Sequence, residues 1–352
     1  LGSWNQGQKG IVTLRDGLGE HSQAAIMRYG PTLTHGHLDE LGLTYYAKGW
    51  QMSSDLGYAW SSTHTQMGWA KQTASHTTVV VNEKSQLRND GSGGSLHLFA
   101  TVPGLQLAEA SSALAYASEG VKEYRRTVAL IGHGKNQVLI DFFRVNGGEK
   151  HDYFVGTQGN HQVVKGVELG EPEQGSLAGV DIDWGTKQNI DGNIVGLAHK
   201  KRWTAPPGNG YGFIYNTRRG IASGSLSSTW KLGGLNDAQF RVHLLAERGD
   251  QIITGQAPGI YPSIRHPSYS IWSRQSINSE ALSSVFSSVM EPFSRPLSMT
   301  VLTALDLFSL QTSSDLITEY RPFSGILQLQ AQENGGFSEF KFIVPEEGVY
   351  YF

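Results

Sequence analysis

Three histidines and two aspartates near the N-terminus form the densest group of metal-binding and proton-transfer side chains in this sequence. They are His35, His37, Asp39, Asp55 and His76. Imidazole and carboxylate are the usual ligands of divalent metals, and imidazole also transfers protons near neutral pH. Two imidazoles with one carboxylate are a common zinc set that leaves one position for water or substrate. The group therefore predicts a metal site or a proton-transfer site.

Short strands and tight turns must bring these residues together. If residues 35–39 are extended, His35, His37 and Asp39 share one face, because alternate side chains of a strand point to the same side. Residues 43–47 and 50–52 are expected strands on either side of a Lys48-Gly49 hairpin turn. That hairpin would return Asp55, 18 residues after His37, to the histidines. His76 is expected to begin a strand over residues 76–82, which are rich in Thr and Val.

Other interpretations of the same residues stay open at this stage. His35, His37 and Glu40 resemble the first metal-binding motif of a cupin barrel. His37 and Asp39 with His76 could instead form the facial triad of a non-haem iron oxygenase. Each residue could also be an ordinary hydrogen-bonded polar group, since histidine is often only a satisfied partner within a fold.

Composition and the spacing of strand-like runs predict a mainly β protein, a large antiparallel β-sandwich. The chain has 43 glycines among 352 residues and only 17% charged residues, which suits many turns between short strands. Helical periodicity is almost absent between the strand-like runs. Beyond the hairpin, the expected strands cover residues 96–102, 123–131, 137–145, 153–156, 194–203, 212–216, 239–246, 251–255, 270–274 and 284–290.

Two domains are expected. The sandwich would fill residues 1–296 and close with the segment Glu291–Pro296. A small β module would start at residue 297 and be cut short at residue 352, because the chain stops within an expected strand. No signal peptide is visible and residue 1 is Leu, so a mature form or a fragment is expected.

Charge and composition exclude several classes of protein. The net charge of −3 gives no basic field for a polyanion, so nucleic acid is not an expected partner. Cysteine is absent, which rules out disulfides, thiolate metal sites and cysteine nucleophiles. No apolar run is as long as the ~18 residues expected of a membrane span.

The spacing of the motifs is similar to that of a known family. The segment His35–Asp39, the hairpin to Asp55-Leu56-Gly57 and the segment Ser75–Gln86 together resemble the heparinase II/III-like superfamily of polysaccharide lyases. Residues 124–128, 141–145 and 284–292 look like later strands of the same domain, and the likeness spans roughly residues 10–293.

The resemblance implies a fold and a reaction. The fold is an N-terminal α/α toroid followed by a two-layer β-sandwich, and this chain is expected to supply only the sandwich and to need the toroid as its partner. The reaction is β-elimination at a uronic acid of an acidic polysaccharide, such as alginate or a glycosaminoglycan. It requires neutralisation of the C5 carboxylate, a base for the C5 proton and an acid for the leaving oxygen. The resemblance also implies a bacterial protein that is secreted or periplasmic.

The family's site residues carry over to particular positions. His35 matches an active-site histidine that faces the cleft, whereas His37, Asp55 and His76 match the ligands of a bound divalent metal, usually zinc. In similar enzymes that metal organises the sandwich beside the cleft, while the Tyr acid/base and the Asn or His neutraliser come from the toroid. We therefore expect little lyase activity from this chain alone.

Further residues are assigned supporting roles. Asp39 would orient the loop that carries the histidines, and Thr77 stands where the family often has Asn, which puts one hydrogen bond to a ligand in doubt. Trp60, Arg125 and Arg202 could hold or stack against a sugar. The alternative function is a non-catalytic carbohydrate-binding or structural sandwich with an architectural metal. An open groove at His35 would favour the enzyme, and a buried, hydrogen-bonded His35 would favour the alternative.

Overall fold

The chain divides into two compact units, Leu1–Arg295 and Pro296–Phe352. In the first unit the computed structural model describes residues 2–32, 36–53, 55–58, 65–88, 93–133, 136–159, 161–189, 194–195, 203–204, 209–233, 238–259 and 266–294. In the second unit it describes four strands. The second unit thus starts at Pro296, whereas the sequence analysis placed the start of the second module at residue 297.

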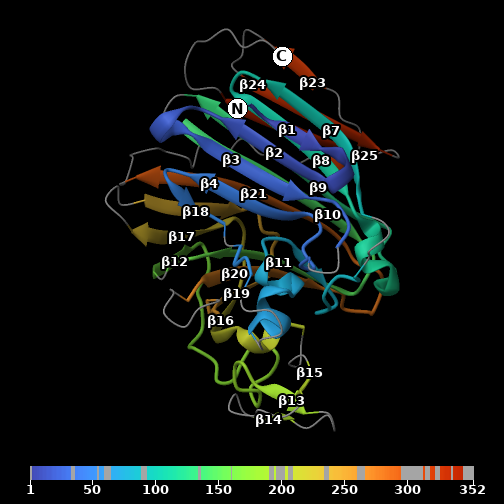
Figure 1. Ribbon diagram of the computed structural model, residues 1–352, viewed down its shortest axis with the longest axis vertical. Coiled ribbons are helices and arrows are strands. Elements are labelled where there is room, and N and C mark those ends of the chain that lie inside the picture. Colours follow the sequence, from blue (N-terminus) through green and yellow to red (C-terminus); the bar gives the residue numbers. More distant parts are fainter. Residues whose placement is uncertain are drawn as a thin grey trace. The chain divides into compact units, whose positions relative to one another are not determined.

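The first unit is built on an eight-stranded antiparallel sheet, so the predicted mainly β fold is confirmed (Figure 1). Its centre is β10, which pairs with β21 through Leu139↔Met290 and with β9 through Leu139↔Leu130. In order across the sheet the strands are β12 (His161–Lys165), β17 (Leu226–Gly233), β18 (Ala238–Leu244), β21 (Ser283–Ser294), β10 (Asn136–Asn146), β9 (Glu123–His133), β8 (Leu105–Ser111) and β7 (Ser95–Val102).

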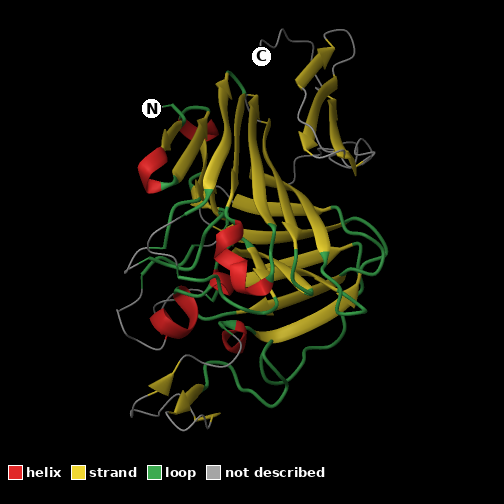
Figure 2. Ribbon diagram, turned by 90° about the vertical axis from the view of Figure 1, so that its right-hand side faces the viewer, coloured by secondary structure: helices red, strands yellow, loops and turns green. Residues whose placement is uncertain are grey.

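Two five-stranded sheets form the second layer of the sandwich (Figure 2). Tyr45 of the first sheet contacts Phe240 of the large sheet at a ring distance of 6.3 Å, and Trp272 of the second contacts Phe286 at 4.9 Å. The first sheet is β1 (Trp4–Gln6), β2 (Ile11–Asp16), β3 (Gln23–Arg28), β4 (Gly42–Ala47) and β5 (Trp50–Gln51); the second is β16 (Tyr215–Ile221), β19 (Gln251–Gln256), β20 (Ser268–Gln275), β11 (Lys150–Thr157) and β6 (Val79–Val81).

The turn at Lys48-Gly49 joins β4 to β5, as predicted. Both residues have positive φ, 54° and 78°, and Ala47 pairs directly with Trp50. Two central residues of positive φ match the right-handed twist of the strands that they join. This hairpin fixes where the chain runs as it approaches Asp55.

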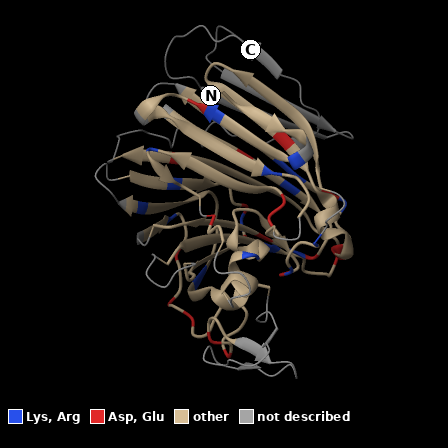
Figure 3. Cartoon of the chain, viewed as in Figure 1, with Lys and Arg blue, Asp and Glu red and all other residues tan. Residues whose placement is uncertain are grey.

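Helical structure among the described residues is limited to short segments of three to seven residues. They are the 3₁₀ helices Gly7–Lys9, Gly19–His21, Thr73–Ser75, Ala113–Glu119 and Tyr211–Phe213, and the π-helix Gln66–Ala70. None of these described helices is long and apolar enough to cross a membrane. Lys, Arg, Asp and Glu lie scattered along the described ribbon (Figure 3).

Three expected strands were wrong in extent. Residues 212–216 begin as the 3₁₀ helix Tyr211–Phe213 before β16 starts. In the range 194–203 the described residues form two short strands, β14 (Ile194–Val195) and β15 (Trp203–Thr204), which pair with β13 (Lys187–Asn189). In the range 76–82 only β6, Val79–Val81, is a strand.

The second unit contains a four-stranded antiparallel sheet of order β22-β25-β24-β23. The strands are β22 (Thr312–Ser313), β23 (Thr318–Arg321), β24 (Ile326–Glu333) and β25 (Gly336–Ile343).

A buried histidine in β11 predicts a loss of stability in acid. His151 is fully buried, with Nε2 2.8 Å from the Gly147 carbonyl oxygen and Nδ1 2.9 Å from Ser284 Oγ. Burial lowers its pKa to about 4, although the Gly147 hydrogen bond opposes the shift. Below pH ~6.5 the unfolded chain binds this proton and the folded chain does not, so stability falls towards pH 4, by up to about 3 kcal/mol.

Urea unfolding between pH 7 and pH 4.5 measures this effect. Wild type and His151→Gln are compared with chelator present, so that every other titrating group is shared by the two proteins. We expect wild type to lose more stability than His151→Gln over this range. Equal losses would show that His151 contributes nothing to the pH dependence.

Candidate metal centre

The structure brings His37, Asp55 and His76 together. One ligand atom from each lies within 4.8 Å of the other two. The histidines are buried, with exposed fractions of 6% and 3%, and Asp55 is half-buried. Two imidazoles and one carboxylate thus converge from segments far apart in the chain.

These residues lie where the two sheets of the second layer meet. His37 follows β3 of the first sheet, Asp55 follows β5 of the same sheet, and His76 precedes β6 of the second sheet. The backbone N–H of Leu43 donates to the Thr77 carbonyl oxygen at 3.1 Å and ties the two sheets together there. The site therefore lies on the seam between the sheets.

Neither histidine lies in a strand, contrary to the sequence expectation. The described residues 36–41 form an irregular segment, in which the Leu38 N–H donates to the Lys71 carbonyl oxygen. His76 ends the 3₁₀ turn Thr73–Ser75, and its N–H donates to the Thr73 carbonyl oxygen at 3.1 Å. The ligands are thus held by tight turns rather than by strand alternation.

The hydrogen bonds of His76 direct its second ring nitrogen at His37. Nδ1 lies 3.0 Å from the Gln72 carbonyl oxygen, which can only accept, so Nδ1 carries the proton. Nε2 then presents a lone pair to His37 Nδ1, 3.1 Å away. A backbone carbonyl that fixes the tautomer in this way is typical of metal-ligating histidines.

His37 can satisfy either a hydrogen-bonded or a metal-bound state. Its Nε2 lies 3.2 Å from the amide of Gln66, whose nitrogen and oxygen are interchangeable by rotation. If the amide nitrogen of Gln66 faces His37 Nε2, Nε2 accepts from it, and the proton on His37 Nδ1 is donated to His76 Nε2. If the amide oxygen faces His37 Nε2 instead, Nε2 carries the proton, and Nδ1 offers a lone pair to a metal. Two nitrogens at about 2.0–2.1 Å from a tetrahedral zinc are about 3.3 Å apart, close to the spacing observed.

At pH 7 His37 and Asp55 are in the protonation states that a metal ion binds. Burial, with a smaller contribution from the nearby His76, lowers the pKa of His37 to about 4, so His37 is neutral at pH 7. Burial alone would raise the pKa of Asp55, but His76, His37 and a 2.9 Å hydrogen bond from the Gly57 N–H outweigh it and hold the pKa below its usual value. Metal binding at pH 7 would therefore displace no proton from His37 or Asp55.

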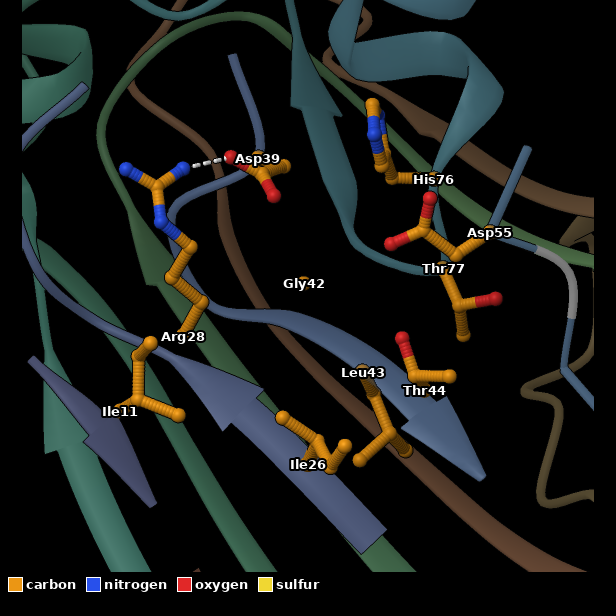
Figure 4. A pocket seen from close by; sticks show the side chains of 10 residues that line it. All are labelled: Ile11, Ile26, Arg28, Asp39, Gly42, Leu43, Thr44, Asp55, His76 and Thr77. Carbon is orange, nitrogen blue, oxygen red and sulfur yellow. Dashed lines mark hydrogen bonds and ion pairs between the residues drawn. The ribbon is translucent and has the colours of Figure 1, made fainter. Parts of the chain in front are cut away.

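A small cleft of about 110 Å³ opens beside Asp55 and His76 (Figure 4). Arg28 and Asp39 form an ion pair on its far side. Arg28 Nη1 also donates to the His37 carbonyl oxygen at 3.3 Å, so this pair orients the loop that carries His37. The sequence analysis expected Asp39 to orient this loop, and its effect on metal binding stays a prediction.

Thr77 lies in the same cleft, and its backbone makes the contacts. Its carbonyl oxygen accepts hydrogen bonds from Leu43 and Arg126. Its Oγ1 is buried without a hydrogen-bond partner among the described residues. The predicted side-chain role of Thr77 therefore has no described contact behind it.

Of the four remaining predicted site residues, only Arg125 lies among the described residues. His35, Trp60 and Arg202 fall outside the residues that the structure describes. Arg125 lies on β9 and forms an ion pair with Glu109, 2.6 Å between Nη2 and Oε1. It points away from the core face that Arg126 occupies, and its predicted contact with a sugar is untested.

The other metal interpretations do not match the geometry. The site lies on a sandwich seam rather than inside a barrel, and the Glu40 carboxylate accepts a hydrogen bond from Ser112 Oγ, so the cupin interpretation is wrong. Asp39 pairs with Arg28, and among the described residues it is Asp55 that groups with His37 and His76, so the geometry does not match the facial triad either.

Sequence reasoning missed residues that support the site. Gln66 and Gln72 reach the two histidines, and the Tyr58 ring lies 4.8 Å from the His37 ring with 55% of Tyr58 exposed. The position of Gln72 four residues before His76 was the signal available, because a tight turn brings such a carbonyl back to the later side chain. The exposed ring of Tyr58 therefore lies beside His37.

Comparison with known proteins shows which family this sequence belongs to. The sequence matches the heparinase II/III-like C-terminal domain over residues 3–275. The chain belongs to this family. An exo-oligoalginate lyase of Saccharophagus degradans is 28% identical over 184 residues, which are 47% of this chain and 24% of that protein. An alginate lyase of Stenotrophomonas maltophilia is 29% identical over 195 residues, 50% of this chain and 26% of that protein.

A solved structure confirms the fold of this family. A heparinase III matches with a TM-score of 0.54 at 13% identity, covering 97% of this chain and 42% of the heparinase chain. In the two alginate-lyase matches, by contrast, the chain spans only about a quarter of the length of each lyase. The expected membership of the heparinase II/III-like lyases, and with it the β-sandwich, is confirmed.

Proposed function

We propose that this chain is the metal-bearing sandwich of a polysaccharide lyase that cleaves an acidic polysaccharide by β-elimination at a uronic acid. The observation that carries the proposal is the convergence of His37, Asp55 and His76 at a seam within the matched family domain. Alginate lyases among the relatives support a uronate polymer as substrate. Export to the periplasm or the exterior is part of the proposal, because such polymers lie outside the cell.

The proposed metal is a divalent cation, with zinc the best fit to the donor set. His37 Nδ1, His76 Nε2 and an Asp55 carboxylate oxygen would hold it, and Gln72 and Gln66 would fix the two imidazoles. When bound, it would supply a fixed positive charge that holds the two sheets of the second layer in register. The seam would thereby give the cleft a rigid wall.

In this proposal the residues of this chain bind and orient, while an N-terminal toroid supplies the acid/base tyrosine. Arg28 is already paired with Asp39, so it holds the His37 loop rather than a substrate carboxylate. Tyr58, whose exposed ring lies 4.8 Å from the His37 ring, would offer an apolar face to a sugar ring. His35 stays the proposed active-site histidine of the sandwich.

The test follows the absorbance of unsaturated uronate as alginate or heparan sulfate is cut. We expect little or no product from the 352-residue chain alone and clear product when an N-terminal α/α toroid is present. Full activity of the isolated chain would overturn the missing-toroid part of the proposal. No product from either form on any uronate polymer, with sugar binding retained, would instead favour a non-catalytic carbohydrate-binding sandwich.

A further inference from the structure

An arginine of the large sheet lies directly beneath the seam. Arg126 projects from β9 into the core and is 0% exposed. Its Nη1 donates to the Leu41 carbonyl oxygen at 2.6 Å and to the Thr77 carbonyl oxygen at 2.6 Å. Leu41 follows His37 by four residues, and Thr77 directly follows His76. One guanidinium nitrogen therefore joins the two segments that carry the histidines.

The other two nitrogens of the Arg126 guanidinium are held by Asp141. Nε and Nη2 donate to the two carboxylate oxygens of Asp141 at 2.8 and 2.6 Å, and Tyr153 donates to the same carboxylate. The guanidinium lies over the Phe143 ring, 5.2 Å from its centroid. A planar fork bound in this bidentate way holds its remaining donors in one direction. Arg126 thus offers the seam a rigid pair of N–H groups.

The segment that Arg126 holds would not adopt its conformation on its own. Leu41 has φ of +58°, a region that non-glycine side chains rarely adopt and that persists only where tertiary contacts enforce it. The Leu41 N–H is also used, donating to the Arg28 carbonyl oxygen at 2.6 Å. Both polar groups of this peptide segment are thus anchored, which fixes the exit of the His37 loop.

We infer that Arg126, held by Asp141, is a positioning residue for the metal site, setting the His37 and His76 segments at the spacing that zinc requires. The inference rests on the proposed metal site. Replacing Arg126 leaves the three ligand residues in place, but it removes the hydrogen bonds that tie the Leu41 and Thr77 carbonyl oxygens to the large sheet. Partners outside the ligand set typically change metal affinity by about 10- to 100-fold when lost.

The chain contains a matched control for a merely structural role. Arg274 binds Asp250 through Nε at 2.9 Å and Nη2 at 2.9 Å, and it lies over the rings of Trp272 and Phe286 at 5.0 and 5.1 Å. Its Nη1 donates to the Val285 carbonyl oxygen in β21, away from the ligand-bearing segments. Loss of Arg274 should destabilise the sandwich without reaching the seam.

The experiment measures Zn²⁺ affinity by chelator competition for wild type, Arg126→Met and Arg274→Met, with thermal unfolding recorded for each. The visible spectrum of Co²⁺ placed in the site reports ligand geometry. We expect Arg126→Met to weaken Zn²⁺ binding by about 10-fold or more and to alter the Co²⁺ spectrum. Arg274→Met should lower the unfolding temperature while Zn²⁺ affinity and the Co²⁺ spectrum stay unchanged.

Arg126→Lys supplies the test if Arg126→Met does not fold, because Lys keeps the charge but cannot hold Asp141 and both carbonyl oxygens at once. Wild-type Zn²⁺ affinity in a folded Arg126 variant would overturn the inference. An equal loss of affinity in Arg274→Met would also overturn it, since general destabilisation would then explain the effect. Absence of Zn²⁺ binding by wild type would instead overturn the metal site itself.

Discussion

Replacing His76 by Ala is expected to lower Zn²⁺ affinity by more than about 100-fold, because loss of a ligand should exceed the 10- to 100-fold effect of a residue outside the ligand set. His76 is the best-oriented of the three groups, with its Nδ1 proton on the Gln72 carbonyl oxygen and its Nε2 directed at His37. Its removal leaves one imidazole and one carboxylate, too few for a tetrahedral site. Chelator competition with purified protein measures the loss.

His97→Ala is the matched control, since it makes the same substitution on the surface. His97 lies exposed on β7, an edge strand of the large sheet, with Nε2 2.7 Å from Ser111 Oγ. Its replacement should leave Zn²⁺ affinity unchanged. If His76→Ala bound Zn²⁺ as tightly as His97→Ala, the three converging side chains would not be the ligands.

Replacing Asp141 by Ala is expected to reduce the free energy of unfolding by about 3–5 kcal/mol, because it leaves the buried charge of Arg126 without its partner. The exposed fractions of the two side chains are 0% for Arg126 and 1% for Asp141, so water cannot solvate the guanidinium in place of the carboxylate. The change also removes the acceptor of the Tyr153 hydroxyl. Urea unfolding at pH 7 measures the difference.

Glu173→Ala removes a comparable ion pair at the surface. Glu173 pairs with Arg219 at 3.0 Å, and about a third of each side chain is exposed. Exposed pairs contribute only about 0–1 kcal/mol, so this variant should unfold almost as wild type does. Similar losses for Asp141→Ala and Glu173→Ala would mean that Asp141 does not compensate a buried charge.

The regular strands could be predicted because their own residues determine them. Residues 123–131 and 137–145 combine aromatic and β-branched side chains, and they pair residue for residue as β9 and β10. β17 was missed because its run of Ser and Thr looks like a loop. Ser228 of β17 is nevertheless buried, because its hydroxyl bonds Ser270 of the facing sheet at 2.6 Å. The strand is therefore explained by its contacts with the second layer and not by its own sequence.

Part of the candidate site could also be predicted from sequence, and part could not. The types and spacing of His37, Asp55 and His76 indicated a ligand set, and the hairpin at Lys48-Gly49 explained how Asp55 returns. The turns that hold the histidines depend on backbone hydrogen bonds to distant residues, such as that from Leu38 to Lys71, and no local pattern encodes them. Arg126 could not be found from sequence, because it acts through backbone carbonyls that only the folded seam brings together.

The central claim is that one cation binds at the seam, and anomalous diffraction at the zinc absorption edge tests it most directly. Crystals of the 352-residue chain grown with Zn²⁺ should show one strong peak at about 2.0–2.2 Å from His37 Nδ1, His76 Nε2 and an Asp55 carboxylate oxygen. Full Zn²⁺ occupancy elsewhere in the chain, or no peak between these three side chains, would contradict the account.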